Sequence, residues 1–64
     1  MVEMKTLQQR EKELTLLLAT IPGRAELAEL AERCHATSGR LKPARTSVIT
    51  YILVNEREQG LING

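Results

Sequence analysis

The sequence predicts an all-α fold, a bundle of three helices in a single small domain spanning residues 1–64. Apolar residues recur at spacings of three, four and seven in three successive segments, as they do along one face of a helix. Clusters of Pro, Gly, Ser and Thr separate these segments and predict turns. A chain of 64 residues is close to the lower size limit for independent folding, which favours one domain.

The first helix is predicted from Glu3 to about Thr20. Leu16 falls opposite the apolar stripe of this helix, and we interpret it as a candidate dimer contact. Pro disfavours a helical residue before it, so Ile21-Pro22-Gly23 is expected to break the helix. The inner face is predicted to consist of Met4, Leu7, Leu14, Leu17 and Leu18.

The second helix is predicted from Arg24 to about Ala36. Its narrow apolar stripe includes Cys34, which we interpret as a small core residue. Glu29 and Arg33 are spaced to form an i,i+4 ion pair on the outer face. Thr37-Ser38-Gly39 is expected to form a turn, with Leu41 as its anchor into the core. The remaining residues of the stripe are Leu27, Leu30 and Ala31.

The third helix is predicted from Pro43 or Ala44 to about Gln59, because Pro suits the first turn of a helix. Gly60 is expected to end it, with Leu61 and Ile62 folding back over apolar surface. Ser47–Val54 also favours a strand, but no second strand exists to pair with it. The residues predicted to face inward are Val48, Ile49, Ile52 and Leu53.

Tyr51 and Val54 are expected on the outer side of the third helix. They either pack partly against the C-terminal tail or form a self-complementary dimer patch, together with Leu16. The chain has no Phe, no Trp and one Tyr, so a monomeric core would bury little area. We therefore expect a homodimer.

Catalysis, metal binding and membrane insertion are not predicted. Cys34 and His35 are adjacent and would point about 100° apart on a helix, and together they do not complete a zinc site within one chain. No glycine-rich phosphate loop is present, so no cofactor is expected. A lone cysteine indicates a reducing cytoplasm. No apolar run approaches the ~20 residues of a membrane span, and no signal peptide is evident.

The charged residues are segregated along the chain. Residues 33–55 contain four cationic side chains and no acidic one, although the net charge of the whole chain is only +1. Segregated positive charge favours a phosphate backbone as partner. The four cations are Arg33, Arg40, Lys42 and Arg45.

Residues 25–62 resemble the helix-turn-helix core of small bacterial and phage DNA-binding regulators, particularly the winged-helix branch. The matching residues are the helix Ala25–Ala31, the turn Thr37-Ser38-Gly39, the helix start Thr46-Ser47-Val48 and the closing Gly60-Leu61-Ile62. The turn from Cys34 to Pro43 is longer than in that family, and Glu56 replaces an apolar residue. No wing follows Gly60, so the resemblance implies a wingless version.

The resemblance implies a dimeric transcriptional regulator that inserts its third helix into the major groove of double-stranded DNA. Arg40 and Lys42 would then contact phosphates. The residues implied to read bases are Arg45, Thr46, Ser47 and Thr50.

The alternative function is a small helical protein-interaction module, an adaptor or inhibitor that buries exposed aliphatic residues on a partner protein. Near-neutral net charge and the acidic face of the second helix favour it. A structural oligomer is a third reading and RNA binding a fourth, although a lone Tyr51 offers little surface for base stacking.

Overall fold

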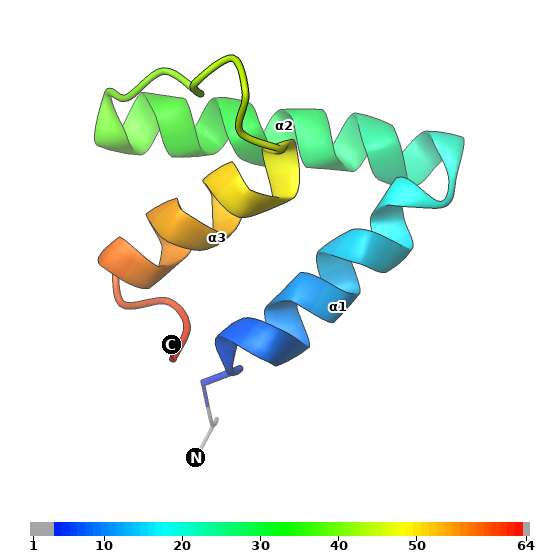
Figure 1. Cartoon of the computed structure of the whole chain (residues 1–64), viewed down its shortest axis with the longest axis horizontal. Coiled ribbons are helices and arrows are strands. Elements are labelled where there is room, and N and C mark those ends of the chain that lie inside the picture. Colours follow the sequence, from blue (N-terminus) through cyan, green and yellow to red (C-terminus); the bar gives the residue numbers. More distant parts are fainter. Residues whose placement is uncertain (1–3, 64) are drawn as a thin grey trace.

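The computed structural model describes residues 4–63 and consists of three helices that all contact one another (Figure 1). They are α1 (Leu7–Leu18), α2 (Ile21–Ser38) and α3 (Val48–Glu58), and none of the described residues belongs to a strand. In Figure 1, α1 and α3 lie on the same side of the longer α2. The predicted all-α fold of three helices is confirmed. The strand alternative is wrong, because nearly all of that segment is α3.

Each helix begins directly after a hydroxyl side chain that caps it. Thr6, Thr20 and Ser47 precede α1, α2 and α3. Each side-chain oxygen accepts a hydrogen bond from the backbone N–H three residues ahead, at 3.2, 3.0 and 3.1 Å. Such a cap satisfies an N–H that has no partner within the helix.

These caps correct the predicted helix boundaries. The predicted start of the first helix at Glu3 lies outside the described residues, and the observed start follows Thr6, whose backbone N–H also donates to the Gln9 side chain. The second helix extends further at both ends than predicted. The third begins at Val48 and not at Pro43 or Ala44, because Ser47 supplies the cap.

Ile21-Pro22-Gly23 was predicted to break the helix, but this segment forms the first turn of α2. Pro is tolerated there because the first N–H groups of a helix have no intrahelical acceptor. Gly23 is buried, and a Cβ atom placed on it would lie 2.0 Å from the Leu17 carbonyl oxygen. The absence of a side chain therefore allows the start of α2 to approach the end of α1 this closely.

The core contains one fully buried side chain from each helix, namely Leu14, Leu27 and Ile52. The predicted inward positions of Leu14, Leu27, Cys34, Ile52 and Leu53 are confirmed. Three other predicted core residues are exposed. Met4, which precedes α1, and Leu18, the last residue of α1, are both 43% exposed. Leu41 is 78% exposed. The surrounding buried residues are Cys34, Tyr51, Leu53 and Ile62.

The C-terminal tail turns back toward the start of α1. The chain leaves α3 at Gly60, which has a φ of +75°, and Ile62 is buried as predicted while Leu61 stays exposed. The backbone N–H of Leu7 donates to the Asn63 carbonyl at 2.6 Å, and that of Asn63 to the Lys5 carbonyl at 2.9 Å. Over residues 4–63, no helix has the combined length and apolar character that would cross a membrane.

Candidate nucleic-acid interface

The predicted DNA-binding residues lie in the connection between α2 and α3, residues 39–47, and in the first turn of α3. In Figure 1 this connection runs back along α2 before α3 begins. Its main attachment is the carbonyl oxygen of Arg40. The Tyr51 hydroxyl donates a hydrogen bond to this oxygen, and Nδ1 of His35 lies 2.9 Å from it. One residue from each flanking helix therefore holds the connection.

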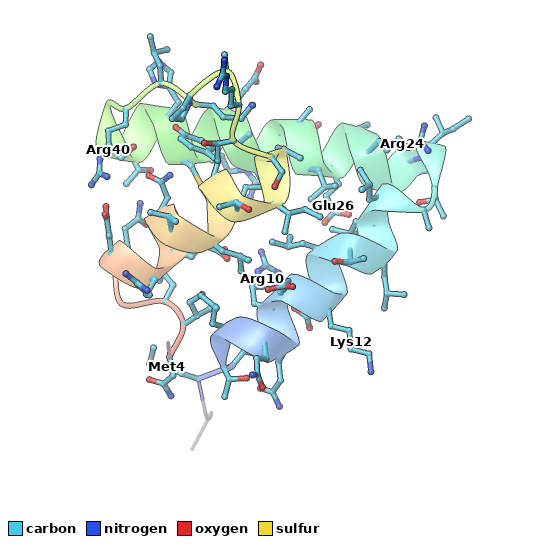
Figure 2. All side chains as sticks on the ribbon, in the orientation of Figure 1. Met4, Arg10, Lys12, Arg24, Glu26 and Arg40 are labelled. Atoms are coloured by element: carbon cyan, nitrogen blue, oxygen red, sulfur yellow. The ribbon has the colours of Figure 1, made fainter. Side chains whose placement is uncertain are left out.

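The three predicted cations of this region differ in their partners. The Arg40 guanidinium forms a two-pronged ion pair with Glu58, with Nη1 3.1 Å from one carboxylate oxygen (Figure 2). Lys42 turns its ammonium onto the carbonyl oxygens of Pro43 and Thr46. Arg45 is exposed and makes no ion pair with any described residue. Of the three, Arg45 has the charge most available to a phosphate.

The three predicted hydroxyl residues are brought together at the start of α3. Ser47 caps the helix and donates to the Thr50 hydroxyl at 2.9 Å. Thr50 is exposed in the first turn of α3, whereas Thr46 is half-buried in the connection. Thr46 and Ser47 thus precede α3, and their predicted position within the helix is wrong because Ser47 adopts the extended conformation of a cap.

One strip of α3 faces solvent, made of Thr50, Val54 and Arg57 at helical spacing. The predicted outer position of Tyr51 is wrong, since this side chain is only 5% exposed. It is buried because the 39–47 connection covers it and accepts a hydrogen bond from its hydroxyl group. Among the candidate dimer contacts, Leu16 and Val54 are exposed at 66% and 38%, so that hypothesis now depends on these two.

A pocket of 290 Å³ lies between the connection and this strip. Asn55 lines this pocket and is buried, with only 2% of its surface exposed. The sequence analysis did not identify it as a site residue. The sequence does contain a signal for its burial. Asn55 follows the inward-facing Ile52 by three positions and Tyr51 by four, so it lies on the same face of the helix as these two residues. The pocket is lined by Arg40, Leu41, Pro43, Thr46, Thr50, Tyr51, Val54 and Asn55.

α3 is fixed against α1 by an ion pair that sequence spacing did not suggest. The Arg10 guanidinium donates to both carboxylate oxygens of Glu56, at 2.9 and 3.0 Å, and both side chains are largely buried (Figure 2). Hydrogen bonding to Glu56 raises the pKa of Arg10 above its usual value. A charge-assisted pair of this geometry orients both partners.

Cys34 and His35 have different surroundings. Burial raises the pKa of the Cys34 thiol, which therefore stays protonated at neutral pH and is a poor nucleophile. His35 is exposed and holds the Arg40 carbonyl. The predicted pair of Glu29 and Arg33 is present at 3.9 Å on the exposed face of α2.

Comparison of the chain with models of protein families, with curated proteins and with solved structures found no match.

Proposed function

We propose that this chain binds double-stranded DNA as a small helix-turn-helix-like transcriptional regulator, with α3 as its reading helix. The observation that supports this most directly is the start of α3. There Arg45 is exposed and forms no ion pair with any residue from 4 to 63, and the exposed Ser47 and Thr50 lie nearby in the sequence. Residues 33–55 include no carboxylate that would repel a phosphate.

The electrostatics of this helix end favour an anion. The first N–H groups of a helix carry partial positive charge, which adds to the charges of Arg45 and Lys42 in the preceding connection. Glu56 and Glu58 lie at the opposite end of α3. In the proposed complex, the first turn of α3 therefore meets the DNA.

Each predicted contact has a specific requirement. Arg45 is free to make a bidentate contact with guanine or to bind a phosphate, and Thr50 presents its side chain from the exposed strip. Ser47 and Thr46 would contact DNA while keeping the cap intact. Arg40 reaches a phosphate only by leaving Glu58, and Lys42 only by leaving two carbonyl oxygens.

The proposed mechanism is occupancy by a homodimer. Two copies would place two α3 helices in successive major grooves and thereby block or recruit the transcription machinery. Leu16 and Val54 are the exposed aliphatic residues that we propose for the dimer contact.

The test is fluorescence anisotropy of a labelled random-sequence DNA duplex, titrated with protein from ~50 to 200 mM salt. We expect affinity to fall steeply with salt. Arg45→Gln should weaken binding and, if Arg45 contacts a phosphate, reduce the slope of log affinity against log salt by about 1. Lys12→Gln is the matched control, because it removes the same charge from the side of α1 remote from α3 (Figure 2). Equal effects of the two variants, or no binding at the lowest salt, would contradict the proposal.

A protein-interaction module is the second candidate, favoured by exposed aliphatic side chains at the corner between α1 and α2. Leu16 and Ile21 are 66% and 81% exposed there, and Leu18 lies between them. Such a surface is suited to a partner protein. Under this alternative the chain ignores DNA at physiological salt, and Leu16→Glu with Ile21→Glu abolishes co-purification of a partner without unfolding the chain.

A further inference from the structure

His35 and Tyr51 meet at one backbone oxygen, the carbonyl of Arg40 near the start of the 39–47 connection. The Tyr51 hydroxyl donates a hydrogen bond to this oxygen, and Nδ1 of His35 lies 2.9 Å from it. A carbonyl oxygen has two lone pairs and no proton to donate, so it accepts a bond from both side chains only if Nδ1 carries a proton. This attachment of the connection to α2 therefore depends on where the protons of the imidazole ring lie.

The protonation state of His35 decides whether this contact attracts or repels. A neutral imidazole has a single N–H, and when that proton lies on Nε2 the lone pair of Nδ1 faces the oxygen. An imidazolium has a proton on both nitrogens, so Nδ1 donates in every molecule. Charge-assisted hydrogen bonds are also about twice as strong as neutral ones. The contact is therefore strongest when the ring is charged.

The ring is placed where solvent protons reach it without unfolding, because His35 is exposed in the last turn of α2. Free carboxylic acids, ammonium groups and phenols titrate well outside pH 5–8, whereas a free imidazole titrates within it. The imidazole is thus the group that switches in this range. The charged and titratable groups around it are Glu32 on α2, Lys42 in the connection, Tyr51 on α3, and the Arg40 guanidinium with its partner Glu58.

We propose that His35 is a pH-sensitive latch on the 39–47 connection, closed more firmly when its ring is protonated. Lowering the pH from 7.5 to 5.5 charges the ring and strengthens its bond to the Arg40 carbonyl, so the connection opens less often. The latch does not depend on DNA binding, although Arg40, Lys42 and Arg45 of the proposed interface belong to the segment that it holds.

The test is NMR of the labelled chain without DNA, from pH 5.5 to 7.5. The ¹³C shift of the Arg40 carbonyl reports the hydrogen bond directly and should follow the titration of the His35 ring. Opening is reported by the Thr46 N–H, which donates to the Pro43 carbonyl within the connection. Its protection from solvent exchange, relative to the intrinsic rate at each pH, should be about 3-fold higher at pH 5.5 than at pH 7.5. The amide of Leu14, in the core, is the internal control.

Three variants separate the latch from a merely structural contact. His35→Asn places an amide N–H near the position of Nδ1 and does not titrate, so it should hold the connection equally at both pH values. His35→Ala should remove the pH response and lower the protection of Thr46 below that of His35→Asn. Tyr51→Phe removes the other donor to the Arg40 carbonyl and should keep the pH response.

Any of four results would overturn the proposal. They are equal or reversed protection of Thr46 at the two pH values, an Arg40 carbonyl shift that does not follow the His35 ring, a pH response that survives His35→Asn, or the same response at Leu14. The last would mean that pH changes global stability and not the connection. Failure of DNA binding leaves each of these readouts unchanged, because no DNA is present.

Discussion

The two connections between helices are built in opposite ways. α1 and α2 are joined by Ala19 and Thr20 alone, and Gly23 lies so close to the Leu17 carbonyl that no Cβ fits. α2 and α3 are joined by residues 39–47, in which Leu41 is exposed. The short connection is fixed by contact between backbones, whereas the long one is held by a few side-chain hydrogen bonds to carbonyl oxygens.

This difference separates scaffold from site. A segment with few buried apolar contacts opens locally at a lower free energy than the core. Binding residues are commonly placed on such loops, where a rigid framework positions them. The proposed DNA contacts and the proposed His35 latch both involve the 39–47 connection, and neither involves the short connection. Substitutions in the two connections should therefore have different consequences.

The largest expected effect on stability is that of Gly23→Ala, which disrupts the close contact of backbones at the short connection. The added Cβ would lie 2.0 Å from the Leu17 carbonyl oxygen and 2.6 Å from the Thr20 hydroxyl oxygen, so the two helices must separate. Overpacking of this severity should lower the free energy of unfolding by about 3 kcal/mol, measured by urea denaturation.

Gly39→Ala is the matched control in the long connection. Gly39 has a φ of +72° and no atom within 4 Å of an added Cβ, so only backbone strain opposes the change. We expect a cost of about 1 kcal/mol. Equal losses from the two substitutions would show that the short connection is not the more rigid of the two.

The second prediction compares two of the three helix caps, Thr20 and Ser47. Thr20→Ala and Ser47→Ala each remove the hydroxyl that accepts a hydrogen bond from a backbone N–H in the first turn. Each substitution should lower the free energy of unfolding by about 1 kcal/mol. Their effects on DNA should differ: Ser47→Ala is expected to weaken DNA binding and Thr20→Ala is not. Parallel losses of DNA affinity would mean that stability, and not contact, is being measured.

The number and order of helices were predictable from the sequence because apolar spacing reports which side of a helix is buried. The helix starts were also encoded, since Thr6, Thr20 and Ser47 are typical caps, but Pro22 and Pro43 indicate different helix boundaries. Tyr51 could not be placed correctly, because its burial depends on where the 39–47 connection folds. The same holds for Leu41, which was expected in the core and is exposed.

The candidate site was less predictable than the fold. Arg45 was predicted to read bases, and Arg40 and Lys42 to contact phosphates, but the sequence did not show that the structure gives each cation a different partner or none. Local sequence does not show that Arg40 reaches Glu58 or that Arg10 reaches Glu56, because both pairs depend on how helices pack. Asn55 was missed for the same reason, since a single polar residue in a helical register does not reveal the pocket beside it.

The third prediction concerns Tyr51→Phe, which loosens the long connection without emptying the core. The ring stays buried and only the hydrogen bond to the Arg40 carbonyl is lost, while His35 still reaches the same oxygen. We expect a cost of about 0.5 kcal/mol, at the lower end for one hydrogen bond. Amide hydrogen exchange should accelerate at Thr46, whose N–H donates to Pro43 within the connection, and not in α1. Uniform acceleration across the chain would show that the connection does not open separately.

The smallest effect on stability is expected for Glu58→Gln, which has the clearest consequence for the proposed interface. The ion pair with Arg40 is exposed, so its loss should change the free energy of unfolding by only about 0.2 kcal/mol, the lower end for such pairs. The freed guanidinium can then reach a phosphate, and the slope of log DNA affinity against log salt should steepen by about 1.

Glu29→Gln is the control for this variant, because it removes the same charge from an exposed pair on α2. General reduction of repulsion raises DNA affinity in both variants, so the decisive quantity is their difference in salt slope. A steeper slope for Glu58→Gln alone would mean that Glu58 restrains Arg40 in the free protein. Identical slopes would remove Arg40 from the DNA contacts and leave Arg45 and Lys42 as the cations of the interface.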